Sequence, residues 1–203
     1  ILAQTLEENS NVVISSHYIF ENGQKQFKWP NSTLLEAEPI MGMLNVSPDE
    51  DGFVRQLPIF SESEKGVLEA FSLAISRIYL HAEGVDYRIH DHRFDFSKTI
   101  QIPVISQTDR ATKEEVNLMN INYFAAPNEF RQISFIDLLN GKLIDKDGEK
   151  IDFRDKIVLI GPTAIDLKDD YLSPVYKKEG VRRMPGVEIH ANAIQTIISG
   201  EFL

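Results

Sequence analysis

The chain has 203 residues, of which 42% are hydrophobic and 26% are charged, an ordinary composition for a globular domain with a sizeable core. Acidic residues outnumber basic residues by 31 to 21, and the resulting net charge of −10 argues against nucleic-acid binding. Cysteine is absent, which removes thiol catalysis, thiolate zinc sites and disulfides.

The N-terminal residues do not look like a targeting segment. No window approaches the roughly 20 apolar residues of a membrane helix, and no charged region followed by an apolar region opens the chain. Ile1, Leu2 and Leu6 instead lie on one side of a predicted amphipathic helix that is already in progress. We therefore expect a fragment of a longer protein.

The first part of the chain predicts a strand followed by a partly helical connection. Residues 11–20 are β-branched and apolar, which favours a strand. A turn follows at 22–24, and residues 29–44 form a broken connection in which Asn31 or Ser32 is the candidate N-cap.

A turn and a long helix come next. Asp51 and Gly52 stand just before residues 53–57, the pattern of a tight turn that leads into a strand. Residues 65–84 give the clearest helix, with Gly84 placed to end it. Its apolar stripe consists of Leu68, Phe71, Ile75, Ile78 and Tyr79.

Short elements fill the second half of the chain. They are an exposed strand at 88–96, strands at 99–105 and 115–124, a short helix at 133–141 and a hairpin-like excursion at 143–153. Residues 155–161 contain four consecutive apolar residues without alternation, which predicts a strand covered on both faces. Because strands and helices interleave, we predict a single α/β domain whose mixed, largely covered β-sheet is flanked by helices.

The long loop at 162–185 is the candidate ligand site. In open α/β sheets, ligands bind beyond the carboxyl ends of strands, so Thr163, Asp170, Tyr171 and Arg182 are the candidate polar contacts beyond Gly161. The loop lacks the glycine spacings that hold nucleotide phosphates. The alternative interpretation is a solvated loop whose aspartates make local turn bonds.

The sequence gives little support for catalysis or metal binding. His90 and His92 would share one face of a strand, but a metal site needs a further ligand that the neighbouring sequence does not supply. Neither acidic turn, at 49–52 and 145–149, has the full spacing of a calcium loop, and no nucleophile elbow is present. We therefore expect no catalytic residue, no metal and no cofactor.

Four residues are predicted to act structurally or in signal coupling. Asp51 shapes its turn, and Arg55 on the following strand can reach a carboxylate or a backbone carbonyl. The final helix should begin at Pro185 or Gly186.

On that helix, Glu188 and His190 point in different directions, so they cannot act as a pair. We expect His190 to be a partly buried residue with a hydrogen-bond partner from the aspartate-rich loop, which would tie the loop to the helix.

Several stretches taken together resemble the second class of CHASE domains, extracellular sensory modules associated with bacterial cyclases and histidine kinases. The specific part is the K-I-V-L-I-G strand, followed by Asp170 and Pro174 and then by the P-G-V-E-I-H-A opening of the final helix. The D-G-F-V-R stretch and residues 133–142 add independent matches.

The resemblance implies that residues 1–203 form an extracytoplasmic sensor domain of a bacterial transmembrane receptor. Membrane helices would flank the domain, and a nucleotide cyclase, a diguanylate cyclase or a kinase would be the intracellular output. The stimulus would be an unknown small molecule or environmental cue, and a homodimer is compatible with this interpretation. The family's usual opening, an initial strand and helix, is missing here.

Two other functions compete with this interpretation. One is a hydrolase that uses Asp166, Asp169, Asp170 and His190 around a metal. The other is a freestanding solute-binding protein.

Overall fold

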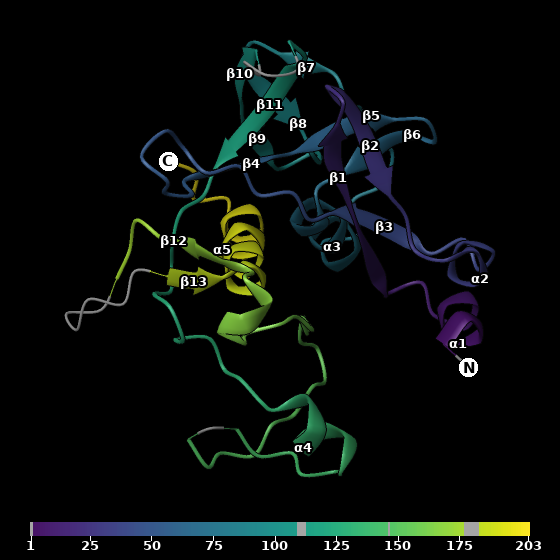
Figure 1. Ribbon diagram of the computed structural model, residues 1–203, viewed down its shortest axis with the longest axis vertical. Coiled ribbons are helices and arrows are strands. Elements are labelled where there is room, and N and C mark those ends of the chain that lie inside the picture. The colour runs from purple at the N-terminus through teal and green to yellow at the C-terminus, as the bar shows by residue number, and fades with distance from the viewer. Residues whose placement is uncertain (1, 109–112, 146, 177–182) are drawn as a thin grey trace.

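The computed structural model describes residues 2–108, 113–145, 147–176 and 183–203 (Figure 1). Helices and strands are mixed along the chain, as predicted, and they form one domain. Within the described residues the strands are divided among several small sheets, and none of these sheets closes into a barrel. The α/β class is therefore confirmed, with several sheets in place of one.

The N-terminal sheet is built around β1 (Val13–Glu21), which follows α1 (Leu2–Glu8). β2 (Gln24–Lys28) pairs antiparallel with the second half of β1, and β3 (Ile40–Met43) pairs parallel with its first half. The short helix α2 (Ser32–Leu35) connects β2 to β3. Its N-cap is the predicted Asn31, whose side chain accepts a hydrogen bond of 3.1 Å from the Leu34 N–H.

The middle of the chain forms one three-stranded sheet and two small antiparallel units. The sheet has the order β10-β11-β4, with β4 at Gln56–Pro58, β10 at Ile105–Thr108 and β11 at Glu115–Asn120. One small unit pairs β5 (Phe60–Ser63) with β6 (Gly66–Glu69). The other joins β7 (Ile89–His90), β8 (Arg93–Asp95) and β9 (Gln101–Pro103).

Two of the predicted elements in this part are wrong in extent. The helix expected at 65–84 is α3 (Phe71–Tyr79), because the residues before it pair with β5 as β6. The exposed strand expected at 88–96 is a hairpin, since Asp91 and His92 have φ values of 48° and 59° and turn the chain between β7 and β8.

Helix α5 (Gly186–Ser199) lies at the centre of the domain and packs along α3 (Figure 1). Its buried Asn192 is paired with the backbone, because Oδ1 accepts hydrogen bonds from the Phe124 and Ala125 N–H groups, each at 3.0 Å. The main apolar cluster includes Val54, Leu57, Ile59, Leu73, Phe94, Phe96, Ile102, Met119, Ile121, Met184, Ile189, Ala193 and Ile197. The buried members of this cluster come from residues 54–121 and from 184–197, so the middle of the chain packs together with β13 and α5.

A separate arm extends from this body, and we call residues 127–145 and 147–160 the α4 arm (Figure 1). It carries the predicted short helix, α4 (Phe135–Leu139), and the predicted excursion, closed by a bridge between Ile144 and Lys150. The apolar side of α4 faces solvent, and Leu139 on that side is 66% exposed.

The buried strand predicted at 155–161 is wrong. The segment is not in a strand, and Val158 and Ile160 are 49% and 71% exposed. The physical reason is that no described strand lies beside it to pair with its backbone.

Candidate sensing and coupling site

The long loop after Gly161 folds back as a two-stranded ribbon. A short 3₁₀ turn, η1 (Ile165–Leu167), precedes β12 (Asp170–Leu172), which pairs antiparallel with β13 (Arg183–Pro185). Arg183 Nε lies 2.9 Å from Asp170 Oδ2 across the ribbon. β13 runs directly into α5, so the ribbon and the central helix are mechanically continuous.

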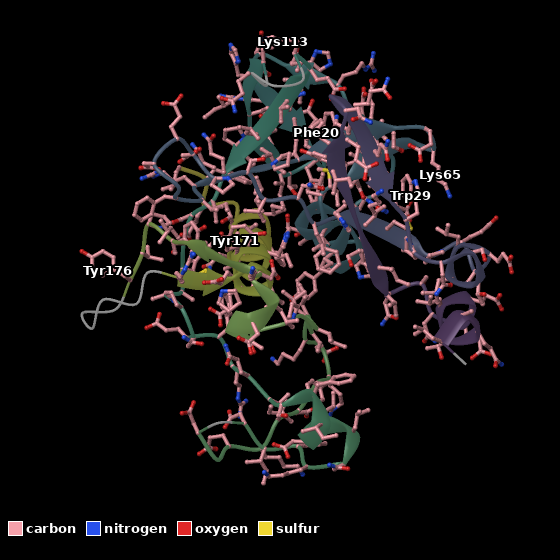
Figure 2. All side chains as sticks on the ribbon, viewed as in Figure 1. Phe20, Trp29, Lys65, Lys113, Tyr171 and Tyr176 are labelled. Carbon is pink, nitrogen blue, oxygen red and sulfur yellow. The ribbon has the colours of Figure 1, made fainter. Side chains whose placement is uncertain are left out.

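The structure describes three of the four predicted ligand contacts. Thr163 is exposed, Asp170 is half-buried in its ion pair, and Arg182 lies outside the described residues. Tyr171 lies over the body beside α5, and its ring packs on the main core (Figure 2). Their role in ligand binding stays a prediction.

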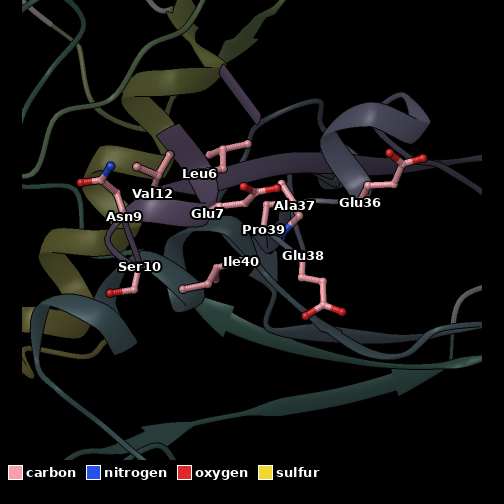
Figure 3. A pocket seen from close by; sticks show the side chains of 10 residues that line it. All are labelled: Leu6, Glu7, Asn9, Ser10, Val12, Glu36, Ala37, Glu38, Pro39 and Ile40. Atoms are coloured by element: carbon pink, nitrogen blue, oxygen red, sulfur yellow. The ribbon is translucent and has the colours of Figure 1, made fainter. Parts of the chain in front are cut away.

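The cavity of about 400 Å³ lies elsewhere, between α1 and the start of β3 (Figure 3). Its walls include Leu6 and Glu7 from α1 and residues 36–40, with three glutamates around it. A second, much smaller cavity lies between the β1–β2 hairpin and β11. Neither is lined by the residues predicted beyond Gly161.

Asp169 joins the ribbon to the N-terminus of α5. The Gly186 N–H donates to the Asp169 backbone carbonyl at 3.0 Å. A Cβ added at Gly186 would lie 2.6 Å from Asp169 Oδ1, so a side chain at this position would require the carboxylate to shift. Burial raises the pKa of Asp169, while a hydrogen bond from Tyr171 acts in the opposite direction. Sequence analysis named Asp169 only as part of the hydrolase alternative, and nothing local in the sequence marks its contact with Gly186.

The turn at Asp51 forms a clasp around Arg55. The Arg55 guanidinium binds Asp51 through two hydrogen bonds of 2.9 and 2.8 Å and also pairs with Asp49. Hydrogen bonding from Arg55 lowers the pKa of Asp51 to about 2. The carboxylate contact expected of Arg55 is therefore present, and Asp49 is the partner that sequence analysis missed.

The clasp is attached to the ribbon. The Val54 N–H donates to the Leu172 carbonyl at 2.9 Å, and Phe53 forms a parallel bridge with Leu172. The Tyr123 hydroxyl donates to the Val54 carbonyl at 2.8 Å. A displacement of β12 would therefore shift the clasp as well as α5.

Glu188 ties the base of the α4 arm to α5. It is 3% exposed, and its carboxylate accepts hydrogen bonds from the Asn128 N–H and the Gln132 side-chain amide. A buried carboxylate needs such donors to offset its desolvation.

His190 is a core residue with a partner other than the one predicted. It is 2% exposed and packs edge-on against Phe71. Its Nε2 lies 3.3 Å from the carbonyl of Leu44, just after β3, and no aspartate of the loop contacts it. The prediction that this side chain ties the loop to the helix is thus wrong; Asp169 and Gly186 make that connection. Burial lowers the pKa of His190 to about 4.

Within the described part of the chain, no group of three His, Asp or Glu side chains is placed to hold a metal ion. None of the described helices combines the length and apolar character that a membrane crossing requires.

Comparison with known families decides the assignment. A family model described as the CHASE2 domain matches residues 1–203. The chain belongs to the CHASE2 family. CHASE2 domains are extracellular sensory domains and are not catalytic, so this chain is a sensory domain. No match was found among curated proteins or among solved structures.

Proposed function

We propose that this CHASE2 domain is the extracytoplasmic input domain of a bacterial membrane receptor with an intracellular cyclase or kinase output. The family match over residues 1–203 is the observation that carries the proposal. The flanking membrane helices, a small-molecule or environmental stimulus and a homodimeric receptor are parts of the same proposal.

The geometry supports a specific route for the signal. The ribbon of β12 and β13 contacts the Asp51–Arg55 clasp on one side and continues into α5 on the other. Because Asp169 and Gly186 fit closely at the start of α5, a change in the ribbon changes the position of that helix. The stimulus would act on the loop, with Thr163, Asp170, Tyr171 and Arg182 as its contacts, and α5 would carry the change onward.

Location is tested by labelling in intact cells. The chain has no cysteine, so K65C in the full gene product introduces a single thiol in this domain, at an exposed position of the β5–β6 turn. We expect a membrane-impermeant maleimide to label it without lysis. Labelling that requires lysis would overturn the extracytoplasmic assignment.

Coupling is tested by basal output of the same receptor. D169N alters the joint at Gly186, whereas D166N changes an exposed aspartate of η1 and is the matched control. We expect a change in output of several-fold for D169N and wild-type output for D166N, with both proteins folded by circular dichroism. Equal output from both variants would overturn the proposed route.

A further inference from the structure

The cavity between α1 and residues 36–40 has an apolar lining that comes from both of its sides (Figure 3). Its volume of about 400 Å³ falls in the range of pockets that hold small organic molecules. The apolar side chains that line it are Leu6, Val12, Ala37, Pro39 and Ile40. Leu6 and Ala37 are buried, at 6% and 8% exposed. The cavity therefore offers apolar surface on which the hydrocarbon part of a ligand can pack.

The rim of the same cavity is anionic. Glu7, Glu36 and Glu38 line it, and all three are exposed. Figure 3 shows the Glu7 side chain extending from α1 toward Ala37 and Pro39. None of the described residues that line the cavity is basic, and in the described part of the chain no basic side chain pairs with these three carboxylates. Their charge is thus not compensated among the described residues, and it favours a cationic ligand.

Backbone groups add to this negative charge. α1 ends at Glu8 and α2 ends at Leu35, so the C-terminal ends of both helices lie at the cavity. The last carbonyl groups of a helix have no partner inside the helix and carry partial negative charge. Neither helix has a basic residue in its last turn. An ammonium group has three N–H donors for such carbonyls and carboxylates, whereas an anion would be repelled by them.

We propose that this cavity binds a small organic amine, whose hydrocarbon part packs on the apolar lining and whose ammonium group lies among Glu7, Glu36 and Glu38. Alkylamines, like the lysine side chain, are protonated at neutral pH. A neutral apolar molecule would leave the carboxylates without a partner, and a bare inorganic cation would leave the apolar lining uncovered. The inference does not depend on the proposed function, because amine binding is measured without any signalling output.

The cavity is connected to the central helix through β3. Ile40 in the cavity wall is the first residue of β3, and the carbonyl of Leu44, just after β3, lies 3.3 Å from His190 Nε2 on α5. A Cβ added at Gly42 would lie 2.5 Å from the Phe71 Cα, so the middle of β3 packs closely on α3. An amine in the cavity would therefore contact a strand that is held firmly in the body.

Binding of hexylamine to the full gene product in lipid nanodiscs tests the proposal. Hexanol and hexanoate have the same chain length without the positive charge, and ethylamine keeps the charge on a shorter chain. We expect hexylamine to bind about tenfold or more tightly than each of the three, since both the charge and the buried methylene groups contribute. Equal affinity for hexanol or hexanoate would overturn the role of the carboxylates. Equal affinity for ethylamine would overturn the role of the apolar lining.

Glutamine substitutions locate the site. The triple variant E7Q/E36Q/E38Q removes the rim charge at exposed positions, and E8Q is the matched control, because Glu8 lies on α1 outside the cavity lining. We expect the triple variant to bind hexylamine about tenfold or more weakly and E8Q to stay within about twofold of the wild type. Uptake of the amine by lipid is the same for all variants and cancels. Circular dichroism checks that each variant is folded, and E7Q alone should weaken binding in the same direction.

Two outcomes would overturn the site. One is equal behaviour of the wild type and the triple variant, including an absence of binding by both, which would mean that another part of the gene product fills the cavity. The other concerns amide hydrogen exchange, which hexylamine should slow at residues 36–43 in the wild type but not in the triple variant. Slower exchange only in other segments would place the amine elsewhere in the molecule.

Discussion

Helix α5 and the α4 arm both contain dense apolar runs, yet their surroundings differ. On α5, Ile189, Ala193 and Ile197 are fully buried, and Asn192 and Thr196 are paired with the backbone at 122–125. In the arm, α4 exposes its apolar side chains to solvent, and Val158 and Ile160 follow the same pattern. The difference shows that an apolar run becomes core only where other elements converge on it.

Among the described residues, Glu188 holds the base of the arm to α5 through Asn128 and Gln132, and Gly161, just after the arm, lies close to Val187. Stability should therefore be concentrated in the body, and the following predictions test this difference from the largest effect to the smallest.

Truncation of a core residue on α5 should cost far more than truncation in the arm. Ile189 is fully buried, so Ile189→Ala should lower the free energy of unfolding by about 2–5 kcal/mol. Leu139 is largely exposed, so Leu139→Ala should change it by no more than about 0.5 kcal/mol. Urea denaturation at equilibrium measures both, and similar losses would show that the arm is part of the cooperative core.

Acid should weaken the body before it weakens the arm. The folded-state pKa of His190 is lowered from 6.5 to about 4, so the unfolded state binds more protons between these values. Stability from this residue is complete above pH 6.5 and is lost as the pH falls toward 4, by at most about 1.4 kcal/mol per pH unit.

In the arm, the Arg131 guanidinium lowers the pKa of Asp145, so its contribution is lost only at lower pH. Urea midpoints measured from pH 7 to 4 should fall for the wild type and stay flatter for His190→Gln. Parallel curves for the two proteins would contradict the assignment of this slope to His190.

Adding a methyl group at Gly186, at the start of α5, should destabilise the body moderately. Gly186→Ala places a methyl group against the Asp169 carboxylate, an overpacking that costs about 1–3 kcal/mol. The double variant with Asp169→Ala should recover part of this loss in the same thermal unfolding assay. No recovery would mean that the loss arises from the backbone of α5.

The smallest expected change in melting temperature comes from removing exposed ion pairs, and two such pairs can be compared. Arg55→Ala removes the clasp and should lower the melting temperature slightly but measurably. Arg154→Ala in the arm removes a local pair with Asp152 from a side chain that is 87% exposed, and should leave the melting temperature unchanged. An unchanged melting temperature for Arg55→Ala, combined with lost signalling, would make Arg55 a ligand contact.

Local patterns in the sequence predicted several elements well. The Asn31 cap, the turn before Phe53, the short helix at α4 and the start of α5 depend on residues within a few positions of one another. The same reasoning overextended α3, because the pairing of β6 with β5 outweighs helical periodicity at Leu68. His190 pairs with a backbone carbonyl, and Arg55 pairs with carboxylates. The periodicity of apolar residues does not locate polar partners of this kind.

The sequence by itself determined the α/β class, the burial of His190 and the positions of most turns, because helix periodicity, capping and glycine backbone preferences act over short distances. Only the tertiary structure decided that Leu44 faces His190, that Asp169 occupies the space beside Gly186, and that residues 157–161 lie unpaired. These contacts join segments from separate parts of the chain. Whether an apolar strand is covered depends on which neighbours reach it, and that is a property of the assembled domain.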